Sequence, residues 1–177
     1  MVISDHQITF TFFVSILILA AFFDIRHRKI PNLLTFPAVL VGLSFHVSTG
    51  GLQGLFFSLK GLGIGFALLI PFYAGGGMGA GDVKLMAAVG AFVGTLQMLK
   101  IFLLTAVCGG VYALVLMVVR GTLLMELSFV MLMLTQAVSG GGLGALRTRV
   151  NTREGMHYTV PYGLAIAVGT ALSFFWP

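Results

Sequence analysis

Long apolar runs, separated by short polar or glycine-rich segments, fill almost the whole chain. A helix needs about 20 mostly apolar residues to cross a bilayer. The runs therefore predict six full spans, at residues 8–23, 33–49, 52–73, 83–98, 101–119 and 160–176. A shorter run, residues 123–138, contains Glu126 and Gln136, so we expect it to lie along the membrane or to re-enter it. The sequence predicts an all-α polytopic membrane protein that forms one integral membrane domain over residues 1–177.

The predicted turns between spans depend on small or charged residues. Gly50 and Gly51 predict a tight turn between the second and third spans, and Lys100 marks the turn between the fourth and fifth. His46, inside the second span, has no second metal ligand at helical spacing, so we expect it to be packed or hydrogen-bonded. Glycines within the spans predict close helix contacts. These glycines include Gly61, Gly63, Gly65, Gly109 and Gly110.

Composition agrees with a membrane protein. Hydrophobic residues make up 58% of the 177 residues and charged residues only 8%, whereas a soluble domain carries about 25% charged residues. The net charge of +5 does not indicate a nucleic-acid partner, because basic residues in a polytopic protein mainly set its orientation. The single cysteine, Cys108, rules out a disulfide framework and a zinc-type cysteine cluster. We expect the lipid bilayer as a partner, and neither a metal nor another cofactor.

Basic residues also set the predicted orientation, because they gather on the cytoplasmic side of a membrane. With the amino terminus outside, the first five spans place these basic residues in the cytoplasm: Arg26, Arg28, Lys29, Lys84 and Arg120. If residues 123–138 do not cross, three more join them: Arg147, Arg149 and Arg153. The same arrangement brings Asp24, at the end of the first span, and Asp82, at the start of the fourth, to the cytoplasmic side.

The stretch at residues 75–86 (GGGMGAGDVKLM) combines five glycines with one aspartate, Asp82. Glycine permits positive φ and close backbone approach, and an ionisable residue in apolar sequence tends to face a water-filled cavity and carry function. The stretch therefore predicts an irregular backbone that presents Asp82 at the start of a helix. The alternative is a glycine-rich loop that ends in a helix N-cap, since aspartate is a favoured cap. Lys84, just beyond, either supports the site or extends its amine toward the interface.

Asp24 and Asp82 form the strongest candidate pair for chemistry. The chain has only five acidic residues, and these two alone fall at the same membrane depth beside irregular or basic sequence. Two carboxylates held close share a proton and titrate as a coupled pair. One then acts as a base on water while the other, protonated, polarises a carbonyl, as in aspartic proteases. For each aspartate taken singly, a structural role at a helix terminus remains the alternative.

Three motifs resemble those of one family. Residues 79–84 (GAGDVK) resemble the GxGD signature of membrane aspartyl proteases, in the form with a following lysine that is typical of type IV prepilin peptidases. Residues 24–32 (DIRHRKIPN) resemble the first motif of that family, and residues 160–163 (VPYG) its third. The resemblance implies a GxGD aspartyl protease bundle in which Asp24 and Asp82 are catalytic. It implies binding or supporting roles for Gly79, Gly81, Lys84, Pro161, Tyr162 and Gly163.

What the resemblance implies about function is specific. The protein would be an endopeptidase of the bacterial cytoplasmic (inner) membrane that removes the short basic leader of a prepilin or pseudopilin, whose hydrophobic helix lies in the bilayer. The paired-cysteine insertion of the larger members is missing here, so the chain is most similar to the short branch that serves tight-adherence (Flp-type) pili. That departure argues against zinc and leaves S-adenosylmethionine-dependent methylation without support.

Two other classes of function stay open at this stage. A proton-coupled transporter also places paired aspartates in a helix bundle, but usually nearer the midplane and often with internal repeats. A non-catalytic assembly partner of a pilus or secretion machine needs neither aspartate. Both aspartates lie at span ends and no convincing repeat relates the halves of the chain, which favours the peptidase.

Overall fold

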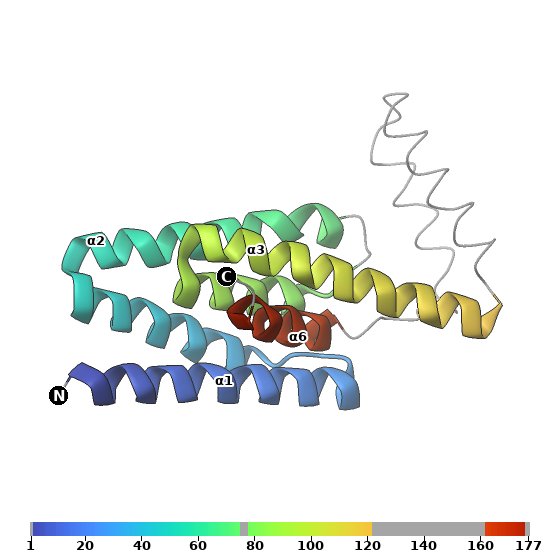
Figure 1. Ribbon diagram of the computed structural model, residues 1–177, viewed down its shortest axis with the longest axis horizontal. Coiled ribbons are helices and arrows are strands. Elements are labelled where there is room, and N and C mark those ends of the chain that lie inside the picture. Colours follow the sequence, from blue (N-terminus) through green and yellow to red (C-terminus); the bar gives the residue numbers. More distant parts are fainter. Residues whose placement is uncertain (1, 75–77, 122–161, 176–177) are drawn as a thin grey trace, which may run out of the picture. The chain divides into compact units, whose positions relative to one another are not determined.

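The computed structural model describes residues 2–74, 78–121 and 162–175 and is helical throughout those ranges apart from short connectors. Its helices are α1 (Val2–His27), α2 (Asn32–Ala74), α3 (Ala80–Arg120) and α6 (Tyr162–Phe175) (Figure 1). The chain divides into two compact units, residues 1–108 with 161–177 and residues 109–160. The candidate site lies in the first unit, where α1 packs against both α2 and α6. The predicted segment 123–138 lies outside the described residues.

Three helical segments are long and apolar enough to cross a membrane: Gln7–His27, Asn32–Ala74 and Ala80–Val119. This confirms the prediction of an all-α membrane protein, while the number of six spans stays a prediction. A straight helix of 43 residues, the length of α2, would measure about 65 Å. The hydrocarbon core of a bilayer is only about 30 Å thick, so α2 must bend to remain in it.

Glycines with left-handed backbone break α2 and α3. Gly51 has φ 56° and Gly94 has φ 73°, a conformation that glycine adopts without steric penalty. At Gly51 the chain reverses, which brings Gly54 against the backbone carbonyl of His46. Figure 1 shows α2 bending back on itself. The turn predicted at residues 50–51 is confirmed. The turn predicted at Lys100 is wrong, because α3 breaks earlier, at Gly94, and is helical at Lys100. A lysine does not require a turn, since its side chain can extend along a helix toward an interface.

The break at Gly94 leaves backbone carbonyls of α3 without helical partners, because the last carbonyls of any helix lack them. Two polar side chains of α2 supply donors. The Ser58 hydroxyl donates to the Ala91 carbonyl at 2.7 Å, and His46 Nε2 donates to the Phe92 carbonyl at 2.9 Å. Unpaired backbone groups are costly in hydrocarbon, so these side chains make the break tolerable. The prediction that His46 is hydrogen-bonded is confirmed.

Small residues let α2 and α3 approach closely. A Cβ added to Gly61 would collide with the backbone of Gly90, and one added to Gly90 would collide with Gly61. A Cβ added to Gly65 would also collide with the α3 backbone, at the Met86 carbonyl. Backbone approach at small residues is the usual way for membrane helices to pack. The predicted helix contact is confirmed for Gly61 and Gly65. It is wrong for Gly63 and Gly110, where an added Cβ meets nothing within 4 Å among the residues that the structure describes.

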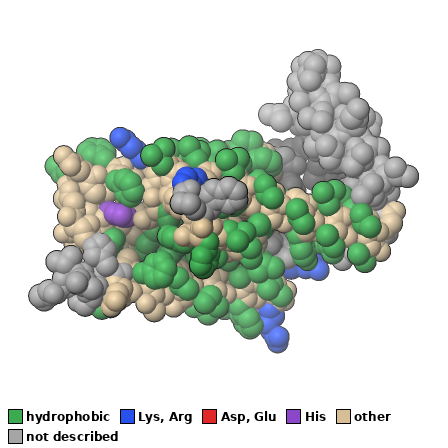
Figure 2. Space-filling view, viewed as in Figure 1, with side chains coloured by type: hydrophobic (Ala, Val, Ile, Leu, Met, Phe, Trp, Pro, Cys, Tyr) green, Lys and Arg blue, Asp and Glu red, His purple; other side chains and the backbone are tan. Residues whose placement is uncertain are grey.

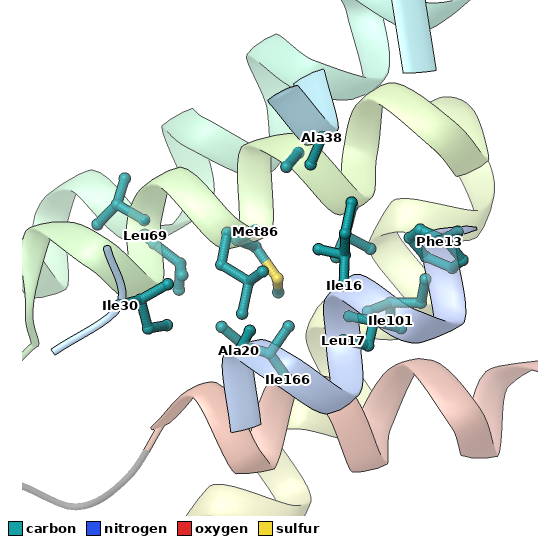
Figure 3. Packing of buried hydrophobic residues seen from close by; sticks show 14 of the residues in the cluster. Phe13, Ile16, Leu17, Ala20, Ile30, Ala38, Leu69, Met86, Ile101 and Ile166 are labelled. Atoms are coloured by element: carbon teal, nitrogen blue, oxygen red, sulfur yellow. The ribbon is translucent and has the colours of Figure 1, made fainter. Parts of the chain in front are cut away.

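The core beneath the site gathers apolar side chains from every helix of the first unit. Met86 of α3 is fully buried in a cluster that also contains Ala20 of α1, Leu69 of α2 and Ile166 of α6 (Figure 3). Ile30 joins the cluster from the connector between α1 and α2. Many large apolar side chains face outward instead, and hydrophobic side chains are spread over the described surface in Figure 2. Helices that are apolar on all sides are typical of a membrane environment.

Candidate active site

Asp82 stabilises the start of α3 from inside the helix. The Gly79 carbonyl accepts a hydrogen bond from the Asp82 N–H at 3.2 Å, which makes Gly79 the residue that caps the helix. The Gly79 N–H in turn donates to Asp82 Oδ2 at 3.1 Å. A side chain in the first turn that reaches back to the capping residue is one half of a capping box. One carboxylate oxygen of Asp82 therefore has the structural role at a helix terminus that the sequence left open. Asp82 fills that role from the first turn of the helix, and Gly79 is the capping residue.

The second carboxylate oxygen of Asp82 is available for other interactions. Asp82 is only 7% exposed, and its buried Oδ1 has no hydrogen-bond partner among the residues that the structure describes. A buried polar oxygen without a partner costs free energy, so capping alone does not account for the position of this side chain. The geometry leaves Oδ1 free to accept a proton from a water molecule or a substrate group.

Asp24 lies in the last turn of α1 and binds the start of α6. The predicted span 8–23 placed Asp24 just after the end of the helix. The helix instead continues to His27, so Asp24 is part of it. Asp24 is 5% exposed, and its Oδ2 accepts a hydrogen bond from the Gly163 N–H at 2.6 Å. The Leu164 N–H also bonds this carboxylate. A helix N-terminus carries partial positive charge, which favours a carboxylate there.

Ile30 links the surroundings of the two aspartates. A Cβ added to Gly81, beside Asp82, would lie 3.0 Å from Ile30 Cβ, and one added to Gly163 would lie 3.0 Å from Ile30 Cδ1. The Ile30 side chain therefore lies against the starts of both α3 and α6. The two carboxyl groups are close enough to interact electrostatically. The fold thus brings together the aspartates that the sequence singled out, with Gly79, Gly81 and Gly163 around them.

The remaining predicted site residues have different surroundings. The Lys84 amine donates to Asn32 Oδ1 at 2.8 Å and lies 5.6 Å from the centre of the Phe36 ring, so it contacts the start of α2. Tyr162 is half-buried at the start of α6, close enough to Asp82 for an electrostatic interaction. Pro161 lies outside the described residues. Within the described ranges, no three His, Cys, Asp or Glu side chains are grouped so as to hold a metal ion.

Sequence reasoning assigned no role to Ile30 or Asn32, although both lie in the quoted motif at residues 24–32. One signal was available for Ile30. It is a lone aliphatic residue between Lys29 and Pro31 in a basic turn, and an aliphatic side chain in such a turn gains free energy when it packs inward. For Asn32 no comparable signal exists, because its partner Lys84 is far away in the sequence.

Comparisons with known proteins point to one family. The model of the type IV leader peptidase family matches residues 11–114. Three curated relatives share the name prepilin leader peptidase/N-methyltransferase. The one from Escherichia coli K12 is 37% identical over 114 residues, which cover 60% of this chain and 49% of the relative. The one from Xanthomonas campestris pv. campestris is 32% identical over 99 residues, covering 50% and 33%.

The third relative, from Aeromonas salmonicida strain A449, is 30% identical over 112 residues, which cover 59% of this chain and 38% of the relative. The chain thus spans about a third to a half of the length of these curated relatives. No solved structure matches the chain.

Proposed function

The chain belongs to the type IV leader peptidase family, and we propose on that premise that it is a membrane aspartyl endopeptidase that removes the leader from a prepilin. The observation that carries the proposal is the pairing of Asp24 and Asp82. Both are buried, both are held through one oxygen by a backbone N–H at a helix start, and the Ile30 side chain lies against Gly81 and Gly163 beside them. Burying two carboxyl groups in apolar surroundings costs free energy, and ionisable residues at such positions are usually functional.

The proposed reaction uses one water molecule and one proton shared by the two carboxyl groups. The ionised carboxylate takes a proton from the water, whose oxygen attacks the carbonyl carbon of the scissile peptide bond. The protonated carboxyl donates a hydrogen bond to the carbonyl oxygen and stabilises the charge that develops there. When the carbon–nitrogen bond breaks, the carboxyl group that took the proton from the water passes it to the leaving amine. Asp82, whose Oδ1 has no partner among the described residues, is suited to bind the water or the carbonyl.

The proposed arrangement in the membrane has six spans. The breaks at Gly51 and Gly94 support two spans in α2 and two in α3, with α1 and α6 as the first and last. Residues 123–138 would lie along the membrane or re-enter it, because the arginines that follow favour the cytoplasm. Both aspartates then lie at the cytoplasmic face of the inner membrane. The substrate would be a prepilin or pseudopilin whose basic leader lies in the cytoplasm, and we expect the Flp type.

Co-expression with candidate prepilins tests the proposal, with leader removal scored by gel shift and membrane abundance measured in parallel. Asp24→Asn and Asp82→Asn should each leave the prepilin uncleaved while the protein inserts at normal levels. The double variant should be no worse than either single one, because residues that act as a unit have non-additive effects. Asp5→Asn is the matched control and should retain activity. Substantial cleavage by well-expressed Asp82→Asn protein would refute the protease assignment.

A further inference from the structure

The connector between α1 and α2, residues 28–31, is tied at its beginning to the helix that carries Asp24. Arg28 has a left-handed φ of 52°, and its N–H donates to the Asp24 carbonyl at 2.9 Å. This arrangement is the usual way to end a helix with a residue in the left-handed conformation. The first residue of the connector is therefore hydrogen-bonded to the backbone of Asp24.

The middle of the connector is wedged between the two other helix starts of the site. Ile30 is 8% exposed and lies against Gly81 of α3 and Gly163 of α6. At Gly81, an added Cβ would lie 3.2 Å from the Ile30 carbonyl oxygen and 3.3 Å from its backbone nitrogen. A buried side chain with these neighbours has no access to a substrate, but it limits how closely α3 and α6 can approach.

The residue that follows the connector is held by a hydrogen bond from α3. The Lys84 amine donates to Asn32 Oδ1 at 2.8 Å, and the Phe36 ring lies beneath the amine. Lys84 follows Asp82 by half a turn of the same helix, and Asn32 follows Ile30 closely. The hydrogen bond therefore joins the helix that carries Asp82 to the first residue of α2, directly after the connector. A lysine that only extended its amine to the interface would have no such partner on another helix.

We propose that Ile30, Asn32 and Lys84 are positioning residues, which together fix the separation of the Asp24 and Asp82 carboxyl groups. Ile30 sets the closest approach of the starts of α3 and α6, and the hydrogen bond between Lys84 and Asn32 holds the start of α3 to the start of α2, directly after the connector. As a statement about catalysis, this rests on the proposed function. It assigns Lys84 to the protein's own geometry and not to binding of the substrate.

Kinetics separate the two roles for Lys84. Lys84→Met and Asn32→Leu should each lower kcat about tenfold with KM unchanged, which corresponds to about 1.4 kcal/mol of lost transition-state stabilisation. The double variant should match the single ones, since both remove the same hydrogen bond. Asn32→Asp keeps the acceptor oxygen and should retain activity. Lys100→Met, which changes an exposed lysine of the same helix, is the matched control. An unchanged kcat, or a rise in KM alone, in Lys84→Met overturns the inference.

A cross-linking measurement supplies a readout that needs no activity. Ile30→Cys and Gly81→Cys are combined in a Cys108→Ser chain, because the 3.0 Å between their Cβ positions requires only a small shift to reach disulfide geometry. Oxidation in isolated membranes should give rapid intramolecular linkage, slower in Lys84→Met and unchanged in Lys100→Met. Equal rates in all three backgrounds overturn the inference. If Lys84→Met slows linkage but the chain without any substitution cleaves no prepilin, the positioning stands and the proposed function fails.

Discussion

Gly163→Ala tests the contact on which the position of Asp24 depends. The Gly163 N–H donates to Asp24 Oδ2 at 2.6 Å, within a buried site. An added Cβ would lie 2.9 Å from that same oxygen and 3.0 Å from both Asp24 Cβ and Ile30 Cδ1. Two of these atoms end their side chains, but Asp24 is held by its hydrogen bond and Ile30 by its packing in the core. The methyl group must therefore displace the carboxylate or push α6 away from α1.

The expected loss follows from the bond that the methyl group breaks. A hydrogen bond to a charged group contributes roughly 1.5–3 kcal/mol. If that amount is lost from the transition state, kcat falls about 10-fold to about 150-fold at 1.36 kcal/mol for each factor of ten. Overpacking in a filled core costs roughly 1–3 kcal/mol of folding stability as well. The loss of activity should thus exceed what reduced protein abundance alone produces.

The assay is leader removal from a co-expressed prepilin, with kcat measured on purified enzyme in detergent and the amount of folded protein determined in the same samples. Gly63→Ala is the matched control, because an added Cβ there meets no atom of the described part of the chain within 4 Å and alanine is the better helix former. It should keep full kcat. If Gly163→Ala keeps full kcat as well, catalysis does not depend on the contact between Gly163 and Asp24, and the position of Asp24 is set by other contacts.

Three further predictions concern the fold. Ser58→Ala leaves the buried Ala91 carbonyl without its donor and should lower the free energy of unfolding by about 1–3 kcal/mol, measured by thermal unfolding in detergent. Gly61→Ala drives a methyl group into the backbone of α3 and should cost about 1–3 kcal/mol in the same measurement, whereas Gly63→Ala should cost none. A reporter fused after Arg153 should read cytoplasmic; a periplasmic signal there would show that residues 123–138 cross the membrane.

The sequence predicted those features that depend on local composition. Apolar runs of sufficient length predict membrane helices whatever their neighbours are, and the glycine pair at residues 50–51 predicts a reversal because left-handed backbone favours glycine. The pairing of Asp24 and Asp82 was also predictable, since charge and span order place both at one end of the bundle. The motifs that contain the two aspartates also indicated the family, and the match of the family model over residues 11–114 shows that family.

The break at Gly94 shows what the sequence could not predict. Many glycines in membrane helices serve only to let backbones approach, and neither Gly90 nor Gly94 carries a local mark that separates a contact from a break. The decisive difference is tertiary. Ser58 and His46 reach across from α2 to the carbonyls that the break exposes. Their positions become informative only once the packing of α2 against α3 is known, and the glycine contacts that set this packing are themselves long-range.

The structure also changes how the two interpretations of each aspartate relate. Capping and catalysis seemed to be alternatives, but a carboxylate has two oxygens with separate acceptor capacity. Asp82 binds the Gly79 N–H through Oδ2 while Oδ1 has no partner within the described ranges, and Asp24 binds the start of α6 through its own Oδ2. When one oxygen is bound to the backbone at a helix start, the orientation of the other oxygen is fixed as well. An asparagine at either position keeps one oxygen that can accept the capping bond, but it loses the charge and the second acceptor oxygen. Asp→Asn variants therefore remove the proposed chemistry while they leave the capping role in place.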